Sequence, residues 1–176
     1  MYDIRISWVA FPLHPETPEE GTTLEELFKG RVDLEGMRAR LMRVAQEEGL
    51  PFGQRGKTYN SRLAQELGKW AESKGEGKAY HDAVFRAYFA EGRNIGKLSE
   101  LAALAGALGL PIEEARKVLE EGSFKDLVDA DWQRCYRMGV HAVPTFLLGD
   151  HVIVGAVPYE TLEKLLIDSS VAKRQP

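Results

Sequence analysis

The sequence predicts an α/β fold in which a block of helices interrupts a small sheet. Three observations lead to this prediction. Apolar and polar residues alternate near the start of the chain, which is the period of a half-buried strand. Residues 33–122 carry only the helical spacing of apolar positions. After residue 144 the two-residue period returns around a glycine turn, and a last helix follows.

The first predicted strand covers residues 2–10. Its side chains alternate in the order Tyr2, Asp3, Ile4, Arg5, Ile6, Ser7 and Trp8. Pro12 ends the strand because proline cannot donate to a sheet ladder. Residues 14–21 then read as a solvated loop, and residues 22–29 predict a short helix.

Five helices are predicted between residues 33 and 122. Asp33 can cap the first helix, and Gly49 can end it. Asn60 or Thr58 can cap the second, and Pro111 opens the fifth. An aromatic stripe in the third helix is interpreted as core and not as a ligand platform. The residues predicted to face inward are Leu34, Met37, Leu41, Val44, Ala45, Leu63, Leu67, Trp70, Ala71, Tyr80, Val84, Phe85, Tyr88, Phe89, Leu98, Leu101, Ala102, Leu104, Ala105, Leu108, Ile112, Ala115, Val118 and Leu119.

The end of the chain predicts a helix, a hairpin and a closing helix. The helix spans residues 123–139, with an inner face of Phe124, Leu127, Val128, Trp132 and Cys135. The pair Gly149-Asp150 joins two apolar runs, which is a strong β-hairpin signal. Pro158 opens the closing helix, and residues 172–176 look frayed.

Composition excludes several classes of protein. The chain has 23 Lys and Arg against 27 Asp and Glu, a formal charge of −4, with 44% hydrophobic residues. This balance does not suggest a basic phosphate-binding surface, so we expect no nucleic-acid partner. The longest uncharged apolar run, residues 101–112, is shorter than the about 20 residues that cross a bilayer. No secretory signal opens the sequence, which predicts a cytoplasmic protein without a membrane partner.

The cysteine count limits the chemistry of the chain. Cys135 is its only cysteine, which excludes an internal disulfide and a Cys-x-x-Cys pair. His14, His81 and His151 are scattered without metal-ligand spacing, so we predict no metal site.

Several segments carry a family resemblance. Residues 139–146 read Gly-Val-His-Ala-Val-Pro-Thr-Phe, and residues 154–159 read Val-Gly-Ala-Val-Pro-Tyr. Residues 11–16, 59–64 and 85–89 extend the likeness over most of the chain. Together they resemble DsbA-like oxidoreductases of the thioredoxin superfamily. The suggested cytosolic branch is also similar to 2-hydroxychromene-2-carboxylate isomerases and kappa-class glutathione transferases.

The resemblance implies an α/β, thioredoxin-like fold with an inserted all-helical domain. Residues 1–32 would form the first thioredoxin-like part, with the family's second strand and a loop. Residues 33–122 would be the inserted helical domain. Residues 123–170 would form the second thioredoxin-like part, with a helix, a cis-proline strand, a hairpin and a terminal helix, before a tail at 171–176.

The resemblance also implies that the fold is N-terminally truncated. In the family the active-site Cys-x-x-Cys, or a serine, opens a helix that follows the first central strand. The segment that matches the second strand begins at Tyr2. Three explanations stay open. The native polypeptide extends upstream of Met1; the chain is complete, with residues 2–10 pairing directly with 145–148 or another protomer filling the gap; or disordered or cleaved residues are missing from the sequence.

The resemblance implies a cis peptide bond between Val143 and Pro144. Proline makes such a bond accessible, because the cis form costs only about 0.5–1 kcal/mol relative to trans. The N–H and C=O groups of Val143 would then face a groove and pair with an extended thiol-containing partner. Periodicity alone instead favours Pro144 as the start of an edge strand in trans.

Three further residues have two interpretations each. Asn60 caps a helix, and the resemblance adds a place beside a ligand pocket. His141 either lines the groove, with a charge that changes near neutral pH, or is an ordinary loop histidine. Cys135 is expected to be buried and inert; the alternative is a reactive thiol approached by His141.

These residues support three functional hypotheses. The leading one is a DsbA-like thiol–disulfide oxidoreductase family member without a redox pair or catalytic residue in this chain, with Val143, Pro144, His141 and Asn60 as substrate-binding residues. The second is a glutathione-dependent isomerase or transferase, and glutathione is the only cofactor that any hypothesis requires. The third is a non-catalytic module that binds an extended peptide, or a homodimer joined at an open sheet edge.

Overall fold

The computed structural model describes residues 1–174 and divides the chain into two compact units. The helical unit is His14–Asp129. The hairpin unit combines residues 1–13 with the chain from Ala130 onward. The boundary between them falls within a helix, α7 (Lys125–Arg137).

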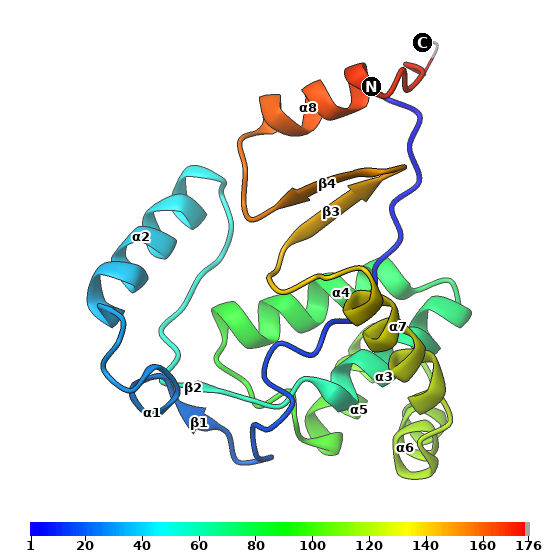
Figure 1. The fold of residues 1–176 in the computed structure, drawn as a ribbon. Helices are drawn as coiled ribbons and strands as arrows, with labels where there is room; N and C mark the ends of the chain where they lie inside the picture. Colours follow the sequence, from blue (N-terminus) through cyan, green and yellow to red (C-terminus); the bar gives the residue numbers. More distant parts are fainter. Residues whose placement is uncertain (175–176) are drawn as a thin grey trace. The chain divides into compact units, whose positions relative to one another are not determined.

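Helices form most of the helical unit (Figure 1). In chain order its elements are β1 (Thr22–Thr23), α1 (Leu24–Phe28), α2 (Leu34–Glu47), β2 (Lys57–Thr58), α3 (Arg62–Ser73), α4 (Gly77–Phe85), the π-helix η1 (Arg86–Ala90), α5 (Leu98–Ala107) and α6 (Ile112–Glu121). All five helices predicted between residues 33 and 122 are present, the third as α4 continued by η1. The short helix predicted within residues 22–29 is α1, and Asp33 caps α2 by accepting a hydrogen bond from the N–H of Gly36.

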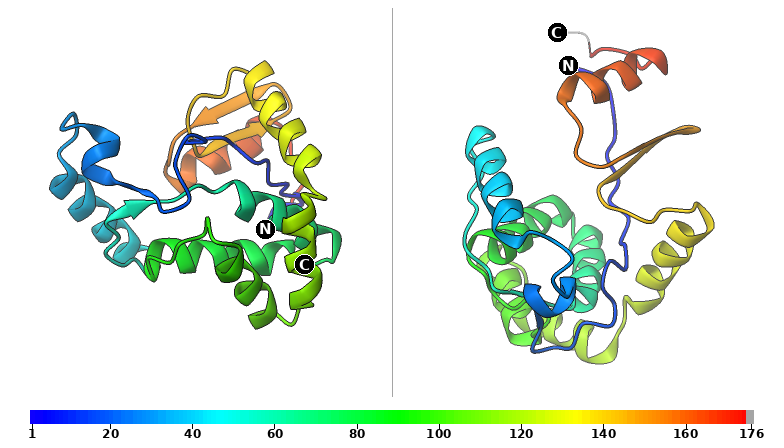
Figure 2. Two further views of the ribbon diagram at one scale, coloured as in Figure 1. Left: turned by 90° about the horizontal axis from the view of Figure 1, so that it is seen from below. Right: turned by 60° about the vertical axis from the view of Figure 1, so that its left-hand side comes forward.

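The core of the helical unit lies among α3, α4, α5 and α6. These helices, coloured from teal through green to yellow-green, lie side by side in both views of Figure 2. Leu67, Trp70 and Leu101 are completely or almost completely buried there. These residues repeat at helical spacing, so one face of each helix is apolar and packs against its neighbours.

Several residues predicted to face inward are exposed instead. In α2, Leu41 and Val44 are exposed and only Ala45 is buried. Phe85, Ile112 and, in α7, Leu127 are also exposed, at 49%, 43% and 53%. Periodicity identifies the apolar face of a helix, but it does not establish that another element covers this face.

A small sheet in the helical unit was not predicted. β1 and β2 are antiparallel, with Thr22 opposite Thr58 and Thr23 opposite Lys57. Each strand has two residues, which is too short for a period-2 pattern to be visible.

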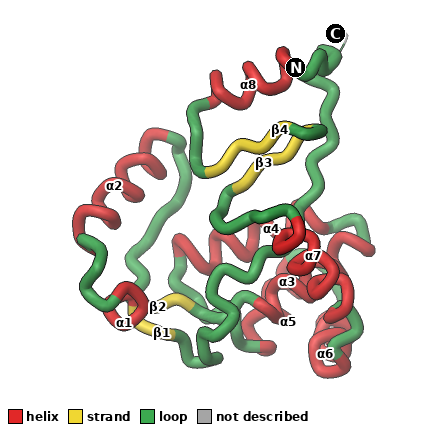
Figure 3. Tube along the Cα trace, in the orientation of Figure 1, coloured by secondary structure: helices red, strands yellow, loops and turns green. Residues whose placement is uncertain are grey.

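The hairpin unit contains the predicted hairpin and closing helix. β3 (Thr145–Leu148) pairs antiparallel with β4 (His151–Val154), and α8 (Tyr159–Asp168) follows (Figure 3). The register places Thr145 opposite Val154 and Leu148 opposite His151. Gly149 has φ +58°, a left-handed conformation that glycine adopts without steric cost.

The strand predicted at residues 2–10 is wrong. The segment makes one isolated bridge, between Tyr2 and Lys173, and Ile6 and Trp8 are exposed. Within the described residues, β3 pairs only with β4, so the direct pairing of residues 2–10 with 145–148 is also wrong. Alternation makes a segment suitable for a strand, but a strand also needs a neighbour whose N–H and C=O groups are within reach.

The end of the described chain is more ordered than predicted. The N–H of Asp3 donates to the carbonyl of Ala172 at 2.8 Å, and the N–H of Arg174 donates to that of Met1 at 2.8 Å. The frayed tail expected from residue 172 is therefore wrong for residues 172–174, while residues 175–176 lie outside the described residues. None of the described helices has the length and apolar character needed to cross a membrane.

Candidate functional site: the loop before β3

A glycine directs the chain from α7 into the loop before β3. Gly139 has φ +67°, and its N–H donates to the carbonyl of Tyr136 at 3.1 Å. The N–H of Val140 reaches the carbonyl of Cys135 at 3.0 Å. These two bonds form a Schellman motif, which satisfies the last carbonyls of the helix and ends it.

The loop presents three of the four predicted site residues to solvent. His141, Val143 and Pro144 are all exposed, with 47% of Val143 accessible. The peptide bond between Val143 and Pro144 is cis. The hydroxyl of Thr145 donates to the carbonyl of Ala142 at 2.7 Å and closes the loop on itself.

The hydrogen-bond pattern leaves one edge of β3 open. The N–H of Gly155 donates to the carbonyl of Pro144 at 2.7 Å, so Pro144 is bonded toward β4. Bonded and non-bonded residues alternate in an antiparallel ladder. The main-chain groups of Thr145 and Leu147 therefore point away from β4, and no described strand pairs with them.

Apart from His141, the loop and β3 carry no ionisable side chain. From Met138 to Gly149 the sequence contains no Asp, Glu, Lys or Arg. Phe146 and Leu147 are 37% and 38% exposed. An open edge without charged side chains can accept another extended chain, because nothing on it repels an added strand.

Cys135 is buried, as predicted from its apolar helix face. It is 6% exposed, and its thiol donates to the carbonyl of Ala10 at 3.6 Å. Asp131 accepts a hydrogen bond from the N–H of Ala10 at 2.8 Å. Burial raises the pKa of the Cys135 thiol, and the negative charge of Asp131 adds to this effect. The thiol is therefore held in its protonated, unreactive form, and no hydrogen bond joins it to His141 within residues 1–174.

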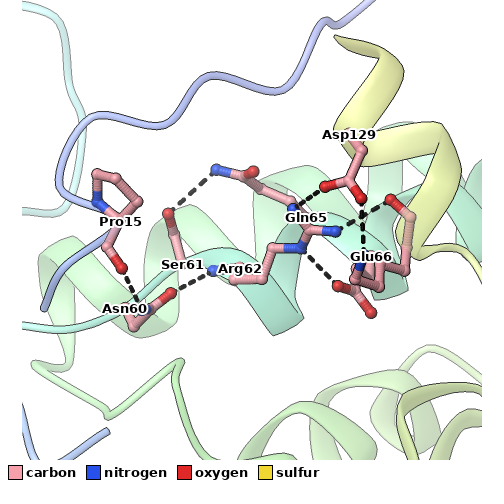
Figure 4. A network of polar contacts seen from close by, with 8 residues as sticks. Pro15, Asn60, Ser61, Arg62, Gln65, Glu66 and Asp129 are labelled. Atoms are coloured by element: carbon pink, nitrogen blue, oxygen red, sulfur yellow. Dashed lines mark hydrogen bonds and ion pairs between the residues drawn. The ribbon is translucent and has the colours of Figure 1, made fainter. Parts of the chain in front are cut away.

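Asn60, the fourth predicted site residue, belongs to the helical unit. Its side-chain nitrogen donates to the carbonyls of Pro15 and Thr17, at 3.1 and 2.9 Å. Its side-chain oxygen accepts from the N–H of Arg62 at 2.9 Å (Figure 4). Both N–H groups of the amide are thus engaged, and only the second lone pair of the oxygen is available to a ligand. Asn60 holds the loop at residues 15–17 against the start of α3.

A polar network that the sequence did not predict follows Asn60. The Arg62 guanidinium contacts Glu66 at 2.5 Å and Asp129 at 2.6 Å, and it donates to the carbonyl of Lys125 at 3.0 Å (Figure 4). Hydrogen bonds from Lys125 and, to a smaller extent, Arg62 lower the pKa of the Asp129 carboxyl. The i,i+4 spacing of Arg62 and Glu66 is a local signal for an ion pair on a helix. Asp129 lies 67 residues from Arg62, so no local pattern could predict its contact with Arg62.

The structure brings three of the four predicted site residues together. His141, Val143 and Pro144 share one loop of the hairpin unit, and Asn60 lies in the helical unit. Residues 1–174 contain no group of three or more His, Cys, Asp or Glu placed to hold a metal ion. The buried thiol supplies no nucleophile.

Comparison with known protein families shows which family the chain belongs to. Residues 1–167 match the DSBA-like thioredoxin domain. The chain belongs to the DSBA-like thioredoxin domain family. The thioredoxin-like α/β fold and the DsbA-like identity predicted from the sequence are therefore confirmed.

Two similar proteins align with almost the whole of this chain. Protein YwbO of Bacillus subtilis (strain 168) is 27% identical over 97% of this chain and 85% of its own length. The crystal structure of a probable DsbA oxidoreductase from Streptomyces coelicolor superposes with a TM-score of 0.83 at 26% identity, over 96% of this chain and 76% of that one.

Two further structures show the fold alone. A 2-hydroxychromene-2-carboxylate isomerase has a TM-score of 0.67 at 24% identity, over 85% of this chain and 70% of its own. The cytosolic disulfide reductase DsbM from Pseudomonas aeruginosa, solved with GSH (glutathione), has a TM-score of 0.56 at 22% identity, over 77% and 76%.

Proposed function

We propose that this chain provides the partner-docking part of a DsbA-like thiol–disulfide oxidoreductase. The loop of His141, Val143 and Pro144 binds an extended, thiol-containing partner, and the chain itself contributes no catalytic residue. The exposed Val143 beside the open edge of β3 is the observation that carries the proposal. Membership of the DsbA-like family supports it. The likeness to DsbM, a cytosolic disulfide reductase, supports a cytoplasmic location.

The chemistry of disulfide exchange explains why docking and catalysis are separated here. A thiolate attacks one sulfur of a disulfide, a mixed disulfide forms, and the other sulfur leaves as a thiolate. A second thiolate then attacks the mixed disulfide and releases the first. Cys135 suits neither step, because it is buried, its pKa is raised and it has no second cysteine to pair with.

Binding of a peptide tests the docking role. The probe is a fluorescent, extended peptide with a central reduced cysteine between apolar residues. Val143→Asp should weaken its binding about tenfold, because an unpaired carboxylate would be buried against the peptide. Val152→Asp, at an exposed position of β4, is the matched control and should change affinity less than about twofold. Equal effects of the two substitutions would contradict the proposal.

A redox assay tests the absence of a nucleophile. The 176-residue chain should reduce insulin disulfides at the background rate of dithiothreitol alone, and Cys135→Ser should give the same rate. Turnover clearly above background would overturn this part of the proposal.

Glutathione is the second candidate partner. It is favoured by the likeness to DsbM, solved with GSH, and to the 2-hydroxychromene-2-carboxylate isomerase. Retention of the chain on immobilised glutathione, lost in Val143→Asp, would support this function. Retention that persists in the variant would place glutathione elsewhere on the chain.

The open edge of β3 also suits a third candidate, a non-catalytic homodimer. Two copies of the edge at Thr145 and Leu147 could pair across a two-fold axis, since such an interface uses the same surface twice. Sedimentation as a strict monomer at micromolar concentration would exclude this arrangement.

A further inference from the structure

We propose that α2 is an interaction surface at which two copies of this chain pair as antiparallel helices. Among the residues of α2 only Ala45 is buried, although the helix carries a regular apolar face. Leu41 and Val44 of that face are 43% and 44% exposed. The helix, cyan in Figure 1, is part of the helical unit, whereas the docking loop and β3 belong to the hairpin unit. This surface therefore shares no residue with the site of the proposed function.

The spacing of the apolar residues in α2 matches one half of a helix pair. Leu34, Met37, Leu41 and Val44 follow one another at intervals of three, four and three residues. These are the a and d positions of a heptad repeat, whose apolar seam packs against the seam of a second helix. Leu34 and Met37 are half-buried, so the uncovered part of the seam is its second half. A helix with the same pattern of apolar residues would cover it.

The charges beside the seam favour a second copy in the antiparallel orientation. Arg40 and Glu47 are seven residues apart and each precedes an a position, so they lie on the same flank of α2. In an antiparallel pair this flank of one helix faces the same flank of the other. A two-fold axis beside Val44 then places each Arg40 opposite Glu47 of the second copy. Because the flank carries one positive and one negative charge, it is complementary to itself.

The parallel orientation is less favourable. In a parallel pair the residue opposite Arg40 is Ala45, which has no charge. The same orientation would bring Asp33 of one copy opposite Arg38 of the other, but both side chains already have partners. The Asp33 carboxylate caps α2, and the Arg38 guanidinium donates to the carbonyl of Arg55 at 3.3 Å. Only the antiparallel pair therefore uses charged groups that are available.

Arg40 and Glu47 are both free to form the contact. Arg40 is exposed, and within residues 1–174 no carboxylate forms an ion pair with it. Glu47 is 3.9 Å from Arg43, and its side chain is 65% exposed. An exposed pair at this distance contributes little to stability, so the carboxylate of Glu47 can turn to the second copy at small cost.

Sedimentation of the full chain from micromolar to submillimolar concentration tests this interface. The unchanged chain should show a concentration-dependent dimer. Arg40→Glu should weaken the dimer about tenfold, because two exposed ion pairs are lost and two contacts between like charges replace them. Lys117→Glu is the matched control, since Lys117 is an exposed lysine of α6 that is 3.8 Å from Glu121. The control should dimerise as the unchanged chain does.

A charge exchange identifies the pair of residues that meet. Combining Arg40→Glu with Glu47→Arg restores opposite charges across the two-fold axis and should restore the dimer. A strict monomer at the highest concentration, or a double variant as weak as Arg40→Glu alone, would overturn the proposal. A dimer that Arg40→Glu leaves unchanged would also overturn it, because such a dimer uses another surface, such as the edge of β3. Val143→Asp should not change dimerisation through α2, so this interface and the docking loop can fail independently.

Discussion

Cys135 lies in α7 with its thiol directed at the backbone of Ala10. The contact ties the helix to the extended first segment, together with the bond from Ala10 to Asp131. A buried thiol of this kind behaves as a small apolar side chain. Membership of a family that includes thiol–disulfide oxidoreductases therefore does not indicate that Cys135 is reactive.

Thiol modification measures this burial. The folded chain should react with Ellman's reagent about 100-fold more slowly than the chain unfolded in guanidinium, because local opening must expose the thiol first. The unfolded chain is the internal control. Equal rates in the two states would contradict the burial of Cys135.

The raised pKa of Cys135 also predicts a pH dependence of stability. Because the folded state holds the proton more tightly than the unfolded state, the contribution is complete at low pH. It is lost as the pH rises above the ordinary thiol value of 9.0 toward the higher folded value. Urea unfolding should show that the stability difference between the unchanged chain and Cys135→Ala decreases over this range. A constant difference would mean that the thiol titrates alike in both states.

The sequence located part of the candidate site and missed the rest. His141, Val143 and Pro144 are contiguous, so a local motif was enough to select them. The bond from the N–H of Arg62 to Asn60 is local, but the other two partners of Asn60 were not predictable, because they are backbone carbonyls of residues 15 and 17 that reach it only through the fold.

At the scale of elements, the Arg62 network connects the start of α3 with residues 125–129 of α7. Glu66 is 4% exposed, and the Arg62 guanidinium lies 2.5 Å from its carboxylate. Removing one partner of a buried ion pair leaves the other charge without compensation, which costs more than the pair itself contributes.

Arg62→Met should therefore lower the free energy of unfolding by about 3 kcal/mol, measured by urea denaturation. Arg43→Met is the matched control, because Arg43 and Glu47 are 3.9 Å apart and both largely exposed; its effect should stay within about 0.5 kcal/mol. Adding Glu66→Met to Arg62→Met should recover part of the loss. Equal losses of stability in Arg62→Met and Arg43→Met would show that the Arg62 network does not behave as a buried one.

Helices and the hairpin were predictable because their signals are local. A helix satisfies its own backbone, and the hairpin needs only two adjacent runs and a glycine turn. Residues 2–10 had an equally regular pattern, yet they pair at Tyr2 alone, because a strand depends on a partner elsewhere. The exposed face of α2 was missed for a similar reason: the pattern of Leu41 and Val44 does not tell whether a neighbour covers them.

At the scale of the whole molecule, the two units have different kinds of stability. The helical unit buries a continuous apolar cluster, from Ala64 to Leu119 in sequence. In the hairpin unit, β3 and β4 form a sheet of two strands, and α8 has no buried residue. A two-stranded sheet is marginally stable by itself, so a partner that adds a strand to β3 would stabilise this unit.

An NMR titration of the ¹⁵N-labelled chain with the reduced cysteine peptide tests the central claim most directly. The docking account predicts saturable shifts of the Val143, Thr145 and Leu147 amides, with the Val152 and Val154 amides at the far edge of the hairpin unchanged. Saturable shifts confined to β4, or no shift at the three β3-side amides under saturating peptide, would contradict it.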